Sequence, residues 1–186
     1  IDTLTIENTL TNDGMLNVRK GTLIVPTYEG TGAICVYDGT NTTITDFNGT
    51  GDIYLFKGSN LTITNYAGTG TIYLEEGATL TIEKGATIPK LVIQTTTATD
   101  ETDFATISTS GTLDVTNATY NSGDIKTVGN ITLPSTESTT NEIGNLEVAS
   151  GELTIETLHA ENITTKETTT LNVENGTITV SENLQN

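Results

Sequence analysis

The sequence predicts an all-β chain that coils as a β-solenoid with rungs of about 19 residues. Three consecutive segments align without a gap, and they begin at Gly30, Gly49 and Gly68. They read GTGAICVYDGTNTTITDFN, GTGDIYLFKGSNLTITNYA and GTGTIYLEEGATLTIEKGA. Thr supplies 43 of the 186 residues, and β-branched side chains favour strands. Such rungs bury an interior only by stacking on one another.

Each repeat is predicted to hold two short strands separated by glycine corners. Aliphatic residues recur at every second position in both strands, as in Ile53-x-Leu55 and Leu61-x-Ile63 of the second copy. Glycine is expected where the chain turns sharply. Two glycine columns recur in all three copies: Gly32, Gly51 and Gly70, and Gly39, Gly58 and Gly77.

The same pattern continues less strictly outside the three copies. Leu16-x-Val18 precedes them, and Leu146-x-Val148 and Leu171-x-Val173 follow them. Polar runs at 95–103 and 135–141 indicate loops or insertions in a looser region. We therefore expect a regular repeat region over 1–94 and an irregular β region over 95–186, continuous as one domain.

If the rungs stack in register, equivalent residues of successive copies lie directly on one another. The alignment places Thr43, Thr62 and Thr81 in one column, Asn41 over Asn60 in a second, and Tyr28, Phe47 and Tyr66 in a third. Asn ladders and stacked aromatics suit in-register strands. The alternative is that each motif is an antiparallel hairpin in a β-sandwich or jelly roll, with strand exchange between subunits.

The repeat from Gly30 to Ala86 resembles the Thr-, Asn- and Gly-rich repeats of β-solenoid surface proteins of bacteria and archaea. Those families include adhesins, surface-layer proteins and subunits of extracellular filaments. The resemblance implies a location outside the cell and a structural or adhesive role, and it implies no particular activity.

Composition excludes several classes of function. The chain has 7 Lys plus Arg against 24 Asp plus Glu, a net charge of −17, so a nucleic acid would be repelled. No apolar stretch approaches the length of a membrane-spanning helix. The chain begins at Ile1 and not at Met, from which we expect a processed or excised chain.

No residue pattern predicts an active site, and we expect no enzyme activity. Cys35 and His159 are far apart in sequence, and neither has a family signature around it. The acidic residues are scattered singly, which disfavours a carboxylate pair for glycoside hydrolysis. The segment from Asp46 to Asp52 copies the start of a Ca²⁺ loop, but Lys57 stands where a bidentate Glu belongs. We interpret it as a polar corner, and weak Ca²⁺ binding is the only cofactor expectation.

Seven sequons for N-glycosylation are present, a mild excess over chance in a Thr-rich chain. The candidate glycosylation sites are Asn41, Asn48, Asn60, Asn117, Asn130, Asn162 and Asn175.

Two features predict an interaction surface. If Ile, Val and Leu face the interior, Cys35 and four aromatic side chains face outward together as an apolar strip. Such a strip is covered either by a neighbouring subunit or by the chain's own second half. The four aromatic residues are Tyr37, Tyr54, Phe56 and Tyr73. The chain also begins with strand-like residues, Ile1, Leu4 and Ile6, which could pair with another copy.

These features together predict a self-assembling subunit of an extracellular filament or surface layer. Its partner would be a second copy of the chain, and a filament results when head-to-tail contacts do not close a ring. The alternative is an adhesin-like module that binds surface glycans through the aromatic strip. Ice binding through Thr43-x-Thr45 and Thr62-x-Thr64 is less well supported, because the third copy has Thr81-x-Glu83.

Overall fold

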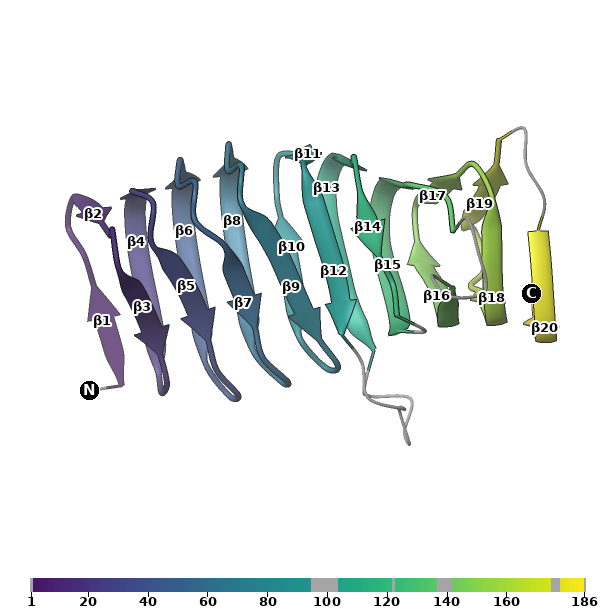
Figure 1. Ribbon diagram of the computed structural model, residues 1–186, viewed down its shortest axis with the longest axis horizontal. Helices are drawn as coiled ribbons and strands as arrows, with labels where there is room; N and C mark the ends of the chain where they lie inside the picture. The colour runs from purple at the N-terminus through teal and green to yellow at the C-terminus, as the bar shows by residue number, and fades with distance from the viewer. Residues whose placement is uncertain (1, 95–103, 122, 137–141, 175–177, 186) are drawn as a thin grey trace.

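The protein is a β-solenoid, as the sequence predicts. A computed structural model describes residues 2–94, 104–121, 123–136, 142–174 and 178–185, with the side chains of 181–183 left out. The chain winds through about nine turns, which stack along the long axis from the N-terminus to the C-terminus (Figure 1). Every described strand pairing is parallel, so the hairpin alternative is wrong.

The strands form two sheets. The 14-stranded sheet contains β1 (Thr3–Thr5), β2 (Thr9–Thr11), β4 (Thr22–Glu29), β6 (Asn41–Phe47), β8 (Asn60–Tyr66), β10 (Thr79–Ile82), β11 (Ala86–Ile88), β13 (Ala105–Val115), β15 (Gly123–Leu133), β16 (Ile143–Ser150), β17 (Glu152–Ile155), β18 (Leu158–Thr165), β19 (Thr170–Val173) and β20 (Ile178–Gln185). The 6-stranded sheet contains β3 (Met15–Val18), β5 (Ala33–Val36), β7 (Ile53–Leu55), β9 (Thr71–Glu75), β12 (Lys90–Gln94) and β14 (Ala118–Thr119).

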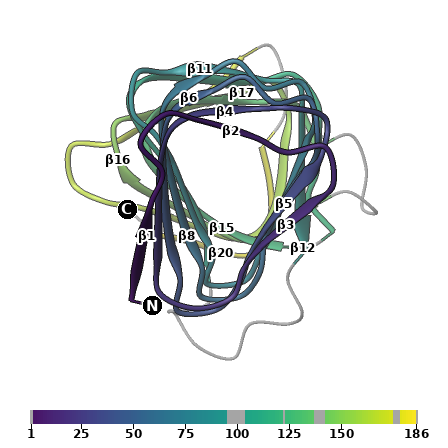
Figure 2. The same ribbon diagram turned by 90° about the vertical axis from the view of Figure 1, so that its left-hand side faces the viewer.

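Seen along the axis, the strands line three sides (Figure 2). β1 lies on the left, β2 and β11 lie along the top, and the 6-stranded sheet with β3, β5 and β12 lies on the right. Long strands bend around the corner between the first two sides. β4 shows this directly, because its first residues pair with β1 and its last residues pair with β2.

The interior is filled by columns of apolar side chains. Alternate residues point inward, so β7 buries Ile53 and Leu55 at 1% exposure while Tyr54 between them points outward. The next rung repeats this arrangement with Ile72 and Leu74. The stacking register equals the 19-residue sequence period, and it confirms the predicted Thr, Asn and aromatic columns.

Glycine recurs at the corners for two physical reasons. Gly39, Gly58 and Gly77 adopt φ of +67°, +71° and +66°, a conformation that costs other residues about 1–2 kcal/mol. At Gly51 the reason is space, since a Cβ there would lie 2.1 Å from the carbonyl oxygen of Gly32 on the preceding rung.

The looser region continues the solenoid with a shifting register. β13 and β15, with 11 residues each, are the longest of the described strands. They pair through a register shift between Ser108 and Thr112, and this shift obscures the repeat in the sequence. β10 pairs with β13 and β12 pairs with β14 across the boundary near Thr95.

Candidate functional site

The two ends of the solenoid are the most exposed apolar parts of the molecule. Each interior column is closed by the rung above and the rung below, except at the first and last rungs. Within the described residues, β1, β2 and β3 at one end and β19 and β20 at the other each pair with a strand on one side only, as do β11 and β14 within the solenoid. Both ends therefore present open parallel strand edges, which are templates for pairing with another strand.

At the N-terminal end, the inward-facing side chains are only partly covered. Leu4 stacks on the buried Leu23 but is itself 50% exposed. Ile6, Leu10 and Leu16 also pack on the core while remaining half-exposed. The sequence pointed to Ile1, Leu4 and Ile6, and Ile1 lies outside the described residues.

The C-terminal end has the same character. Ile178 and Leu184 pair with the buried Leu158 and Ile163, and they are 47% and 66% exposed. Leu171 and Val173 of β19 are half-exposed above the buried Leu153 and Ile155. The sequence repeat includes Leu16 without marking it as an end residue, and Leu10 and Leu184 lie outside the predicted interface residues. The sequence signal that could have identified these residues is that each occupies an inward position of an end rung.

The aromatic strip lies on the outside of the 6-stranded sheet, in the predicted register. Tyr54 and Tyr73 stack with ring centroids 4.6 Å apart and an interplanar angle of 4°. Tyr37 and Phe56 stack at 4.6 Å, and the Arg19 guanidinium lies 4.7 Å from the centroid of the Tyr37 ring. The rings therefore cover one another's faces and present mainly their edges and hydroxyls to solvent.

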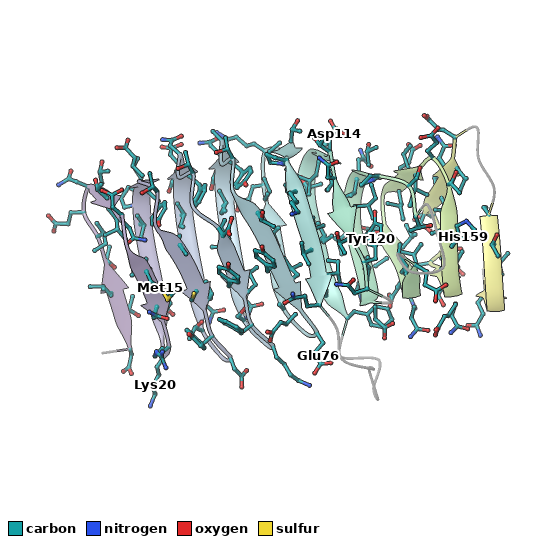
Figure 3. The ribbon with its side chains drawn as sticks, in the orientation of Figure 1. Met15, Lys20, Glu76, Asp114, Tyr120 and His159 are labelled. Carbon is teal, nitrogen blue, oxygen red and sulfur yellow. The ribbon has the colours of Figure 1, made fainter. Side chains whose placement is uncertain are left out.

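Cys35 corrects one expectation about this strip. It occupies the outward position in register with Tyr54, but it is only 4% exposed because the larger side chains of neighbouring rungs cover it. Burial raises the pKa of the Cys35 thiol, which disfavours the reactive thiolate. His159 lies on β18, near the opposite end of the solenoid from Met15 (Figure 3). Met15 is on β3, which pairs with β5, the strand that holds Cys35. The structure does not bring Cys35 and His159 together.

Acidic side chains at the corners join successive rungs. In the candidate Ca²⁺ loop, the Asp52 carboxylate accepts the backbone N–H of Thr71 at 2.8 Å, and Asp46 accepts the Asn65 side-chain amide at 2.6 Å. The same contact recurs where Asp124 accepts the N–H of Asn145 at 2.7 Å. These bonds support the polar-corner interpretation. No group of three or more His, Cys, Asp or Glu in the described ranges is arranged to hold a metal ion.

One polar cleft of about 500 Å³ opens near β14, where the 6-stranded sheet ends. Thr, Ser and Asn side chains line it, together with Glu156 and Glu174. At this cleft the Ser135 hydroxyl donates a 3.4 Å hydrogen bond to the Glu156 carboxylate, and neither Cys35 nor His159 lines it.

The sequons differ in accessibility. Asn41, Asn48, Asn60, Asn117 and Asn130 are exposed, and Asn162 is half-buried. The side-chain amides of Asn117 and Asn162 donate hydrogen bonds to Pro89 and Asn145 of neighbouring rungs. Asn175 lies outside the described residues.

Comparisons with known proteins add no identity. The described residues include no helix with the length and apolar character of a membrane span. No protein-family model, curated protein or solved structure matches the chain. The likeness to bacterial and archaeal surface repeats is therefore supported in its fold and repeat character alone.

Proposed function

We propose that the chain is a structural module of an extracellular filament or surface layer, and that its copies stack end to end through parallel strand pairing. The observation that carries this proposal is the pair of open ends, each with unpaired strand edges and half-exposed interior side chains. The occupant of each end is the opposite end of a second copy.

The chemistry of the two ends favours this occupant. A strand edge offers backbone groups at regular spacing, and a parallel strand from another rung satisfies them. The half-exposed side chains of β1 and β20 would then gain the cover that inner rungs already have. Because the two end surfaces differ, the contact is head to tail and does not close on itself, and such contacts build filaments.

The proposed extracellular location rests on surface chemistry. Exposed Asn48, Asn117 and Asn130 carry sequons, and asparagine glycosylation belongs to secreted and surface proteins. A net charge of −17 keeps rods soluble and apart. It also opposes association, so added salt should promote stacking of the ends.

The glycan-binding alternative loses support from the aromatic strip. Sugar rings stack on open aromatic faces, whereas Tyr54 and Tyr73 stack on each other and Tyr37 lies between Phe56 and Arg19. These contacts bind rung to rung. No catalytic role is proposed either, because Cys35 and His159 lie on distant rungs.

Self-association of the purified chain tests the proposal. Sedimentation velocity over a range of concentrations, with negative-stain electron microscopy, should show rods longer than one molecule. The rods should lengthen in about 1 M salt, where charge is screened within about 3 Å. Chains that remain monomeric at every concentration, with and without salt, would overturn the proposal.

Variants of the end residues locate the joint. Leu4→Asn and Leu184→Asn remove exposed apolar side chains at opposite ends, and each should raise the concentration for association about 10- to 30-fold. Met15→Asn is the matched control, because Met15 lies on the first rung at 64% exposure but faces away from the interior. If the control impairs association as much as the end variants do, the joint is not at the interior columns. Thermal unfolding verifies that each variant folds.

A further inference from the structure

We infer that the chain has a second interaction surface, which packs side by side against the same surface of a second copy. The inference rests on the proposed structural role, but it concerns the width of an assembly and not its length. The surface is formed by outward-facing residues of β1, β4, β6, β8, β10 and β13, on the left side in Figure 2. This threonine face consists of Thr3, Thr5, Thr22, Ile24, Asn41, Thr43, Asn60, Thr62, Thr79, Thr81, Thr106 and Ser108.

The threonine face is two unbroken columns across six rungs. In one column the register runs from Thr3 to Thr106, and in the other it runs from Thr5 to Ser108. No register shift interrupts either column. Neighbouring rungs are about 4.8 Å apart, and the two columns are about 7 Å apart along each strand. The result is a regular surface of small side chains.

The lack of charge on the threonine face favours a second copy of the chain as its partner. None of the twelve residues is charged, although the chain carries 24 acidic residues and a net charge of −17. Surfaces that carry the acidic residues repel each other when two copies approach, whereas this face brings no like charges together. The first column ends at the seventh rung, where Lys126 follows Thr106 in register and pairs with Glu147 at 3.2 Å, while Val128 follows Ser108 in the second column.

The shape of the side chains suits this contact. Small side chains on in-register strands interdigitate closely when two identical sheet faces meet. Ile24 lies in the second column at 38% exposure, while the other exposed large hydrophobic residues of the described chain lie on the first rung or the last strand. A second copy would cover Ile24.

The size of the face makes the contact weak for single modules. Six rungs by two columns cover roughly a few hundred Å², less than the about 800 Å² per partner of a stable interface. Rods built from many modules repeat the face along their length, so the weak contacts add by multivalency. Side-by-side packing is therefore expected to bundle finished rods while single modules meet only transiently.

The proposal also constrains glycosylation. Asn41 and Asn60 stack directly on each other within the threonine face, and a glycan on either would hold a second copy away. Asn48 lies outside the face and is free of this constraint. Glycopeptide mass spectrometry of the native protein should find Asn41 and Asn60 unmodified.

Cysteine cross-linking tests the surface even when no rods form, because it traps transient encounters. Thr62 is near the middle of the face. With the faces fully overlapped, its offset in the plane of the contact from Thr62 of the second copy is about one rung, ~5 Å, for antiparallel copies and about one column spacing, ~7 Å, for parallel copies. The variant is Thr62→Cys with Cys35→Ser, and Thr50→Cys at an exposed corner is the matched control. If Cys35→Ser does not fold, Cys35 can stay, since it is only 4% exposed.

We expect disulfide-linked dimers of Thr62→Cys to form about 10-fold faster than those of Thr50→Cys. Adding Thr43→Glu should reduce the rate to that of the control. Where rods form, Thr43→Glu should separate bundles into single rods of unchanged length, whereas Leu4→Asn should shorten rods. Equal cross-linking rates for Thr62→Cys and Thr50→Cys, or a glycan at Asn41 or Asn60, would overturn the inference and leave the end-to-end proposal intact.

Discussion

The first five rungs and the later rungs share one architecture but differ in regularity. In residues 2–94 the strand pairings repeat with an offset of 19 residues, as between Asp46 and Asn65, except for an offset of 18 where β2 pairs with β4 and β3 pairs with β5. In residues 104–185 the offset varies, from 21 residues between Asp124 and Asn145 to 17 between Asn145 and Asn162. The 6-stranded sheet also ends at the two-residue strand β14, while the 14-stranded sheet continues.

This difference separates what the interior requires from what the outside requires. Ile131 and Leu153 pair and are buried in the irregular rungs as deeply as Ile53 and Ile72 are in the regular ones. Apolar columns therefore tolerate bulges and a variable period. Outward-facing columns of like residues do not tolerate bulges or a variable period. The stacked tyrosines and the threonine face both occur where the register is unbroken. The N-terminal end and the threonine face depend on the regular rungs, whereas the C-terminal end lies in the irregular region.

The largest expected effect comes from breaking the close approach of regular rungs. Gly51→Ala places a Cβ 2.1 Å from the carbonyl oxygen of Gly32, and the neighbouring backbone has to move apart. We expect the free energy of unfolding to fall by about 4 kcal/mol or more. Urea denaturation measures the change.

Gly39→Ala is the matched control for that substitution. Its added Cβ meets nothing within 4 Å, but φ at Gly39 is +67°, so the cost should be about 1 kcal/mol. Equal losses for the two variants would show that backbone conformation, and not the distance between rungs, makes the regular corners require glycine.

A smaller effect should distinguish the acidic corner contacts of the two regions. Asp124 is 5% exposed and accepts the N–H of Asn145 at 2.7 Å, whereas Asp52 is half-buried and accepts that of Thr71 at 2.8 Å. Asp124→Ala leaves a buried N–H without its partner, and we expect a loss of about 3 kcal/mol against about 1 kcal/mol for Asp52→Ala. Chemical denaturation of both variants measures the difference. A larger loss for Asp52→Ala would mean that the regular rungs depend more on these contacts.

The same contrast explains how much could be predicted from sequence. The repeat from Gly30 onward determined the register of Tyr54 on Tyr73 and of Asn41 on Asn60, because one period acts on every residue of a rung. The strands β13 and β15 could not be read in this way, since a bulge between Ser108 and Thr112 moves equivalent residues out of alignment.

The accessibility of single residues was harder to predict than their register. Cys35 points outward as expected, yet its neighbours bury it. Its burial depends on the sizes of side chains on the two adjacent rungs, which are 18 and 19 residues away in sequence. The three aligned copies also indicated only part of the threonine face. Thr3, Thr22 and Thr106 join it only through pairings outside the three aligned copies.

The smallest effect concerns alkaline pH and the buried tyrosines. Burial raises the pKa of Tyr66 from 10.0 to about 12, so the neutral phenol is favoured in the folded state. The stabilisation is fully present below pH 10, the ordinary tyrosine pKa, and is lost as the pH rises through about 12. Burial also raises the pKa of Tyr120 in the irregular region, where its hydroxyl donates a 2.7 Å bond to the Pro134 carbonyl.

Tyr66→Phe should therefore change stability little at neutral pH and should lessen the alkaline loss in the regular rungs. Urea denaturation at about pH 8 and about pH 11.5 measures both, and ultraviolet absorbance follows the phenolate. Tyr120→Phe serves as the comparison, because it should lower stability at both pH values by losing a buried hydrogen bond. If Tyr66→Phe shows the same alkaline loss as the unmodified protein, the Tyr66 ring is solvated, and the stack with Phe47 does not exclude water from it.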